Sequence, residues 1–169
     1  MIAAQNPEKQ LQGFIRKFDS RHQVLIRAVR KILRRRFPCA HELVYDNYNF
    51  FVIGYCSSER PSDCIFSIAA AASGVSLCFM YGARLADSQK LLRGSGKQTR
   101  FLRLESALDL ERFEVQELLR GAAEQAKTPL SIEGRGELII RSVSAKQRPR
   151  KMPVKAQQAK AAAPVRTRS

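Results

Sequence analysis

The chain has 169 residues, of which 44% are hydrophobic, and its formal net charge is +15 at pH 7. This length fits one domain with appended segments, and the hydrophobic content suffices for a buried core. No run of about 18 apolar residues predicts a membrane span, and the first residues turn polar too soon for a signal peptide. We therefore expect a cytoplasmic protein with flexible residues 1–7 and a folded domain over residues 8–144.

The positive charge is concentrated at the two ends of the chain. Residues 1–40 hold ten Lys or Arg and two acids, whereas residues 41–144 hold twelve basic and thirteen acidic residues. Residues 145–169 hold eight Lys or Arg, no acid and no aromatic side chain. Such a segment cannot bury enough apolar surface to offset the entropy of ordering, so we expect a disordered basic tail. The tail either binds phosphate backbones by releasing counterions or only improves solubility.

The first elements of the chain are expected to be helices. A short helical segment runs from Pro7 to about Phe18, and a second helix follows from a cap at Asp19 or Ser20 and stops at Pro38. In the second helix, helical spacing places the apolar residues Leu25, Val29, Ile32 and Leu33 in one stripe. The flanks and the other side carry Arg27, Arg30, Lys31, Arg34 and Arg35. This basic face is either solvated or in contact with a polyanion.

After Pro38 the pattern changes from helix to strand. Residues 48–56, 64–72, 75–82 and 99–106 favour strands, and Ser73-Gly74 suits a hairpin turn. Ser106 and Asp109 have the spacing of a capping box that begins a helix before Pro129, and a hairpin of residues 130–134 and 136–144 follows. The order predicts an α+β fold, with an antiparallel sheet of about five to six strands backed by the N-terminal helices and one later helix.

The stretch GSGK at residues 94–97 raises the question of a phosphate-binding loop. A Walker A motif requires a glycine where this chain has Leu91 and a hydroxyl residue where it has Gln98, and the dinucleotide fingerprint lacks its third glycine. We interpret the two glycines as backbone hinges that lead the chain into the next strand. Lys97 and Arg100 add positive potential beside them.

The remaining polar residues predict no complete catalytic constellation. The four cysteines have no C-x-x-C spacing and only two histidines accompany them, so we expect buried, reduced thiols, with no metal and no cofactor. Residues 45–49 form the densest polar and aromatic cluster, which is either a hydrogen-bonded turn or the wall of a small-molecule pocket. The residues of such a pocket would be Tyr45, Asn47, Tyr48, Asp87 and Lys97.

Three segments read together resemble the YdhG-like family, a domain of unknown function. They are ELVYDNYNFFVIGY, GVSLCFMYGARLADSQKLLRGSGKQTRFLRLES and GELIIRSVSAKQRPRK, and the resemblance spans roughly residues 10–151. It implies a frataxin-like and YjbR-like fold, an antiparallel sheet backed by helices, and no established catalytic residues. Some members are discussed as iron chaperones, but that role depends on an acidic first helix, and the helix here is basic.

We therefore expect a non-enzymatic cytoplasmic binding or adaptor module with an unidentified protein or small-molecule partner. The alternative is low-specificity association with nucleic acid through the basic helix and the tail, without base reading. Frataxin-like iron binding is a further alternative, which the basic helices disfavour. The residues expected to contact a polyanion are Arg27, Arg30, Lys31, Arg34, Arg35, Lys97, Arg100, Arg148, Arg150, Lys151 and Lys155.

Overall fold

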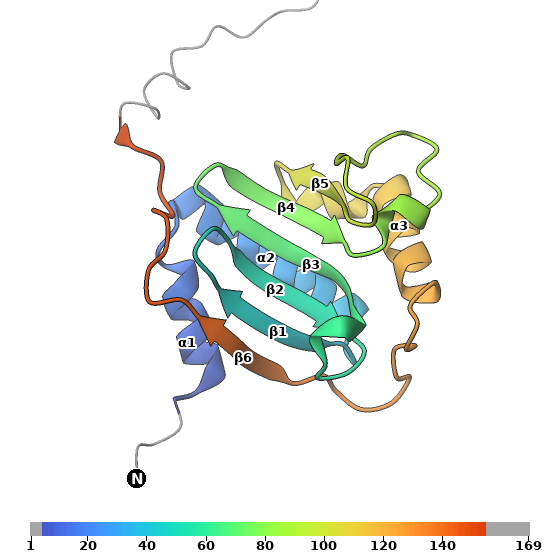
Figure 1. The fold of residues 1–169 in the computed structure, drawn as a ribbon, viewed down its shortest axis with the longest axis horizontal. Helices are drawn as coiled ribbons and strands as arrows, with labels where there is room; N and C mark the ends of the chain where they lie inside the picture. Colours follow the sequence, from blue (N-terminus) through green and yellow to red (C-terminus); the bar gives the residue numbers. More distant parts are fainter. Residues whose placement is uncertain (1–4, 155–169) are drawn as a thin grey trace, which may run out of the picture.

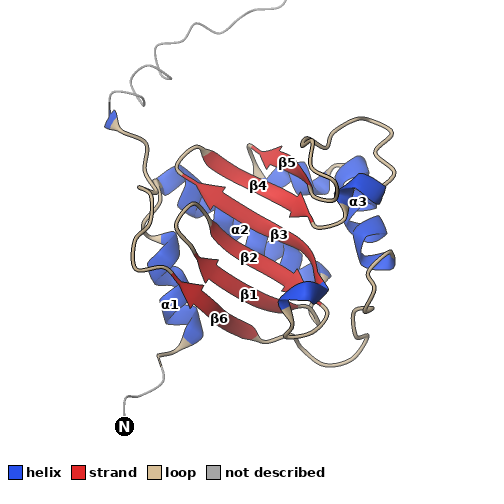
Figure 2. Ribbon diagram, in the orientation of Figure 1, coloured by secondary structure: helices blue, strands red, loops and turns tan. Residues whose placement is uncertain are grey.

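A six-stranded sheet with helices behind it forms the core of the computed structural model, which describes residues 5–154 (Figure 1). The strands are β1 (His41–Asp46), β2 (Phe51–Cys56), β3 (Cys64–Ala71), β4 (Gly74–Phe79), β5 (Arg100–Leu104) and β6 (Leu138–Val143). The helices are α1 (Pro7–Ile15), α2 (Ser20–Arg36) and α3 (Phe113–Glu124). Short 3-10 turns lie at Pro61–Asp63, Gly82–Arg84 and Ala107–Glu111. The fold is therefore α+β, as the order of elements predicted (Figure 2).

The sheet is mixed rather than wholly antiparallel. Its strand order is β5-β4-β3-β2-β1-β6, and all neighbours are antiparallel except β6, which runs parallel to β1. The expected hairpin of residues 130–134 and 136–144 is therefore wrong. Only its second half forms a strand, and that strand pairs with β1, whose outer edge would otherwise leave its backbone groups unpaired.

Strand β1 is an element that the sequence pattern did not predict. Glu42, Val44 and Asp46 alternate on the face that packs against the helices, opposite Tyr55, Ile53 and Phe51 of β2. Two of these three inward residues are acidic, so the apolar alternation of a half-buried strand is hidden. Ion pairs with basic residues of the helices and the C-terminal segment neutralise both carboxylates inside the fold.

Local signals explain the ends of the two N-terminal helices. The side chain of Asn6 accepts hydrogen bonds from the backbone N–H groups of Glu8 and Lys9, so it caps α1. Asp19 precedes α2 but its side chain makes no capping hydrogen bond, so the expected cap is absent there. Pro38 follows the last turn of α2, as expected of a residue that cannot continue a helix.

The core lies between the sheet and the helices, and the other face of the sheet carries both small and large side chains. Phe66 and Ile68 of β3 point into the core, whereas Ser67 and Ala69 lie on the opposite face. In the described part of the chain, no α-helix covers that face, which is turned toward the viewer in Figure 1, and only the short 3-10 turn at Pro61–Asp63 lies in front of it, at one corner. We call it the open face of the sheet.

The segment after β6 packs back onto the fold. Arg150 is buried and donates hydrogen bonds to Asp46 and to the backbone oxygens of Asn47 and Asn49. Residues 145–150, which composition assigns to the disordered tail, therefore belong to the folded body. Residues 155–169 lie outside the described residues. Among the described helices, none is both long enough and apolar enough to cross a membrane.

Candidate functional site

A groove of about 470 Å³ lies where α1, α2 and the loop before β6 meet. Gln12 of α1, five basic residues of α2 and Arg135 of the loop form its wall. The residues of α2 are Arg27, Arg30, Lys31, Arg34 and Arg35. Spacings of three and four residues bring these side chains to one side of the helix, so the sequence pattern itself builds the wall. We call this feature the basic groove.

Arg30 lies beneath the basic groove rather than on its surface. The residue is 6% exposed, and its guanidinium donates to Glu42 at 2.8 and 2.9 Å and to Glu8 at 2.7 and 2.8 Å. These bonds from Arg30 lower the pKa of Glu8 to about 2. Tyr55 also donates to Glu42 at 3.2 Å. Arg30 was expected to contact a polyanion, but the structure uses it to tie α1 and α2 to β1.

The other cations of the basic groove are more accessible. Arg27 donates to Gln12 at 2.9 Å, which fixes its guanidinium along the groove. Arg34 is about half exposed and lies 3.8 Å from Glu42 and 4.0 Å from Glu8, whose strong hydrogen bonds go to Arg30. Lys31, Arg35 and Arg135 form no salt bridge with any residue of the described range. Six cations therefore face only two carboxylates.

The chemistry of the basic groove suits the binding of anions. Its lining consists of arginine, lysine and one glutamine. Guanidinium groups present donors in a planar fork that matches phosphate oxygens, and they remain charged in partly buried sites. The arrangement suits an extended anion that replaces several weakly bound counterions at once.

The five residues expected to line a small-molecule pocket do not come together. Asn47 and Tyr48 lie in the turn between β1 and β2, where Ser142 donates to the Asn47 side chain at 2.8 Å. The guanidinium of Arg148 lies 5.6 Å from the centre of the Tyr48 ring. This part of the cluster is a hydrogen-bonded turn against the C-terminal segment, the simpler of the two interpretations that the sequence left open.

The other members of that set lie elsewhere. Tyr45 is on the open face of the sheet, where partial burial raises the pKa of its hydroxyl. Asp87 lies in the connection between β4 and β5, at the opposite end of the sheet from the β1–β2 turn, and accepts from the backbone N–H groups of Leu91 and Leu92. Lys97 is exposed in the same connection. A single pocket of these residues is therefore not formed.

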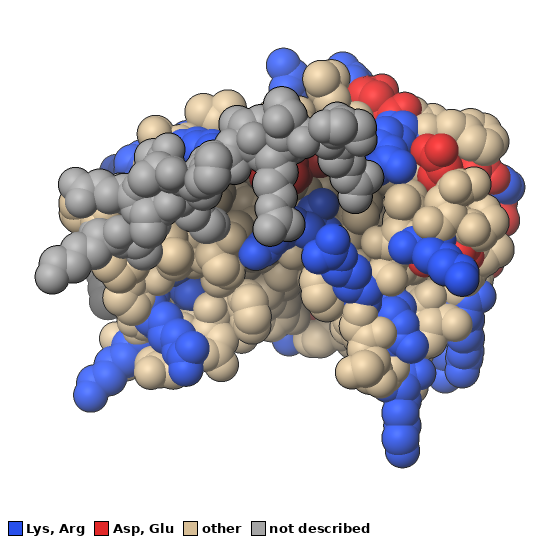
Figure 3. Space-filling model, turned by 90° about the horizontal axis from the view of Figure 1, so that it is seen from above, with Lys and Arg blue, Asp and Glu red and all other residues tan. Residues whose placement is uncertain are grey.

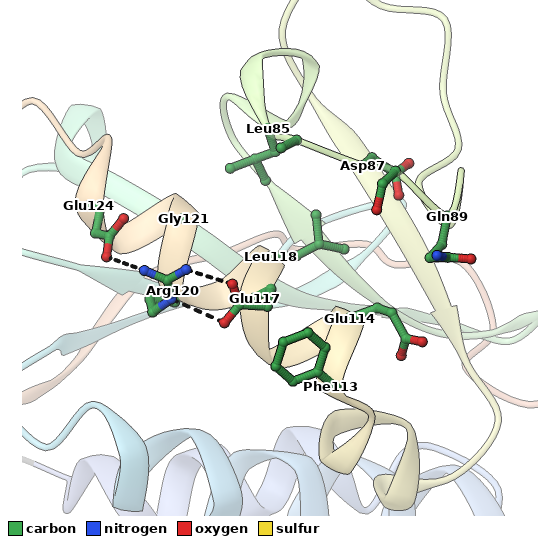
Figure 4. A pocket seen from close by; sticks show the side chains of 12 residues that line it. Leu85, Asp87, Gln89, Phe113, Glu114, Glu117, Leu118, Arg120, Gly121 and Glu124 are labelled. Atoms are coloured by element: carbon green, nitrogen blue, oxygen red, sulfur yellow. Dashed lines mark hydrogen bonds and ion pairs between the residues drawn. The ribbon is translucent and has the colours of Figure 1, made fainter.

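A second cavity, which the sequence analysis missed, lies between this connection and α3 (Figure 4). It encloses about 490 Å³, and its wall includes Asp87, Phe113, Glu117, Arg120 and Glu124. Arg120 binds both glutamates, which lie three and four residues away on the same helix. These bonds from Arg120 lower the pKa of Glu117. The spacing of charges along α3 was the available signal, and it indicates a solvated helix face as readily as a site.

The remaining basic residues are dispersed rather than gathered. Lys and Arg side chains project from much of the surface seen in Figure 3, and Asp and Glu show mainly toward the end that carries α3. The Arg100 guanidinium forms hydrogen bonds within its own segment, because it donates to the backbone oxygens of Gly96 and Thr99. Of the C-terminal candidates, Arg148 and Lys151 are exposed, Arg150 is buried as described above, and Lys155 lies outside the described residues.

The structure also bears on the two glycines at residues 94 and 96 and on metal binding. Gly94 has a φ of 118°, so it needs the freedom of glycine, whereas Gly96 does not have a positive φ. Within residues 5–154, no three His, Cys, Asp or Glu side chains are grouped so as to hold a metal ion.

Comparison with known proteins found no similar protein or family. A scan against protein-family models found no match, and searches of curated proteins and of solved structures found none either. The functional conclusion therefore depends on the basic groove itself.

Proposed function

We propose that this protein is a non-enzymatic, cytoplasmic binding module of the YdhG-like type that holds the phosphate backbone of a nucleic acid in the basic groove. The observation that supports this proposal is the unequal charge of the groove, where six cations face two carboxylates that Arg30 already binds. Lys31, Arg35 and Arg135 therefore have no salt bridge within the described residues that an external anion would have to displace, and Arg34 lies only at the edge of salt-bridge distance from the two carboxylates.

The spacing of the cations favours an extended polyanion over a small anion. Arg27, Lys31 and Arg35 follow one another at intervals of four residues, which correspond to about 6 Å along a helix. That interval allows one cation for each phosphate along a strand. A single small anion would meet only one or two of these side chains, and it would gain little from the rest.

The composition of the basic groove indicates binding without sequence reading. Its lining contains neither an aromatic side chain for base stacking nor an acidic or free amide pair for base edges, apart from Gln12, which holds Arg27. Affinity should therefore come from phosphate contacts and should fall steeply as salt increases.

The experiment compares two charge-reversal variants of the full chain. In Lys31→Glu/Arg35→Glu the change lies in the basic groove, and in Lys90→Glu/Arg93→Glu it lies in the exposed connection between β4 and β5. Both variants alter the net charge equally. Fluorescence anisotropy with a labelled duplex over a salt series should show a log–log slope smaller by about 1.8 in the groove variant, from about 0.9 per phosphate contact.

The control variant should keep the slope and the affinity of the native chain. If both variants lose affinity equally, net charge alone attracts the nucleic acid and the basic groove is not its site. If neither variant loses affinity and removal of residues 155–169 abolishes binding, the tail is responsible and the proposal is wrong.

A further inference from the structure

Two cysteines meet across neighbouring strands on the open face of the sheet, away from the basic groove. Cys56 is the last residue of β2 and Cys64 is the first residue of β3, and their Cα atoms are paired in the antiparallel register. The register shifts between Tyr55 and Cys56, so residue 56 lies opposite residue 64 instead of residue 65. Because of this bulge, Ile65 stays buried in the core, and Cys64 takes the position beside Cys56 that Ile65 would otherwise have.

The two sulfur atoms converge above the backbone of Gly54. A Cβ atom built on that glycine would lie 3.1 Å from the Cys64 sulfur and 3.7 Å from the Cys56 sulfur. The space that any other residue would fill is therefore occupied by the two thiols. Both side chains belong to the open face, because Gly54 alternates with the core residues Ile53 and Tyr55.

Hydrogen bonding makes the two thiols unequal. Hydrogen bonding with the Cys56 side chain and with the backbone of Tyr55 lowers the pKa of Cys64, whose own thiol donates to the backbone oxygen of Phe66 at 3.5 Å. The same thiol–thiol bond raises the pKa of Cys56. Cys56 is fully buried, whereas Cys64 is partly exposed. Cys64 is therefore the more accessible of the two sulfurs to an external oxidant and the one that ionises more readily.

The other two cysteines are not paired with a cysteine in the strand register: Cys78 lies opposite Ser67, and Cys39 lies outside the strands. Burial raises the pKa of Cys78 to about 11, which keeps its thiol protonated and inert. Cys39 donates to the backbone oxygen of Gly134 at 3.2 Å in the loop after α2. These two residues are natural controls for a reaction specific to the pair.

We propose that Cys64 and Cys56 form an oxidisable dithiol that a hydroperoxide converts reversibly into a disulfide. The Cys64 thiolate attacks one peroxide oxygen, the O–O bond breaks, and the sulfur becomes a sulfenic acid while hydroxide or alkoxide leaves. Cys56 then attacks that sulfur, the S–S bond forms, and water leaves with the proton of the Cys56 thiol. Two thiols are thus oxidised by two electrons and one hydroperoxide is reduced, and a cellular thiol reverses the step by exchange.

The test uses the reduced full chain and hydrogen peroxide, followed by disulfide mapping. All four cysteines lie between Arg36 and Arg84, and the basic residue between them, Arg60, precedes Pro61, so trypsin leaves them on one peptide. Cleavage after glutamate separates Cys39 from Cys56 at Glu42, and Cys56 from Cys64 at Glu59. Chymotrypsin then separates Cys64 from Cys78 by cutting after Phe66.

The native chain should lose two of its four titratable thiols, lose the mass of two hydrogen atoms, and yield a peptide that joins Cys56 to Cys64. The Cys56→Ser variant should stop at a sulfenic acid on Cys64, which dimedone traps. The Cys39→Ser and Cys78→Ser variants should form the disulfide at the native rate. A disulfide that includes Cys39 or Cys78, or a sulfenic acid that appears first at either, would overturn the proposal. So would the absence of any disulfide in the native chain, a result that needs no variant.

Discussion

The Arg30 ion-pair cluster allows the most quantitative prediction, because the structure shows what each partner loses. In Arg30→Met, the Glu42 carboxylate remains almost fully buried and loses its two hydrogen bonds from the guanidinium. Removing one member of a buried pair costs about 3–5 kcal/mol, and here the Glu42 carboxylate would keep only the Tyr55 hydroxyl and the more distant Arg34 as partners. We expect the free energy of unfolding at pH 7 to fall by that amount.

The contribution of Glu8 is smaller and depends on pH. The lowering of its pKa from 4.5 to about 2 would correspond to about 3 kcal/mol if the group were buried, but Glu8 is about half exposed. Solvent screening reduces the expected contribution to about 1 kcal/mol. Because the folded pKa lies below the unfolded value, this stability is present above pH 4.5 and is lost as the pH falls toward 2. Glu8→Gln should therefore remove it at neutral pH and flatten that part of the pH profile.

Urea unfolding followed by circular dichroism measures both effects. Arg30→Met should lower the midpoint strongly, and the double variant Arg30→Met/Glu42→Leu should recover much of the loss, since both charges are then removed. Arg120→Met breaks exposed pairs on α3 and should leave the midpoint nearly unchanged. A loss below about 1 kcal/mol in Arg30→Met, or a double variant no more stable than the single one, would refute this reasoning.

Further predictions concern the C-terminal segment and the glycines. Truncation after residue 144 removes Arg150, leaves Asp46 with Lys17 as its charged partner, and should cost about 3 kcal/mol in urea unfolding, whereas truncation after residue 154 should cost nothing measurable. Equal stability of the two truncated chains would contradict the docking of this segment. Gly136→Ala would bring a Cβ atom within 1.8 Å of the Ala40 oxygen and should destabilise by about 3 kcal/mol or more, while Gly96→Ala meets nothing within 4 Å and should be tolerated. Equal thermal midpoints for these two variants would show that the loop before β6 does not approach Ala40 so closely.

The sequence predicted the helices and the hairpin of β3 and β4 because their signals are local. The apolar stripe of α2 is read directly from spacing, and Gly74 marks the turn between β3 and β4, where its φ is 143°. The parallel pairing of β6 with β1 has no such signal, because it joins residues nearly a hundred positions apart. Burial of Glu42 and Asp46 depends on partners from distant segments, and these make β1 recognisable only in the folded chain.

The candidate site was predictable in part for the same reason. Arg27, Lys31, Arg34 and Arg35 share one side of a helix, so their grouping follows from helical spacing. Arg30, in contrast, is buried because it contacts residues of α1 and β1, and sequence spacing does not reveal such contacts. Likewise, Arg135 joins the basic groove only because the chain returns to β1 through the loop before β6.

The pairing of Cys56 with Cys64 could not be predicted from the sequence either. Cysteines eight residues apart carry no recognised motif, and the register shift that sets them opposite each other is a property of the sheet. The sequence predicted buried, reduced thiols, but only Cys56 is buried, and Cys39, Cys64 and Cys78 are partly exposed. The proximity of two of them is what the three-dimensional arrangement adds.

The central claim is that the basic groove holds the phosphate backbone, and an NMR titration with a short duplex tests it most directly. With the backbone amides of the full chain assigned, we predict that the largest chemical-shift changes fall on Lys31, Arg35 and Arg135 and their neighbours. These changes should disappear in Lys31→Glu/Arg35→Glu and persist in Lys90→Glu/Arg93→Glu. Shifts that map instead to α3 or the open face, or that are confined to the C-terminal segment, would contradict the account.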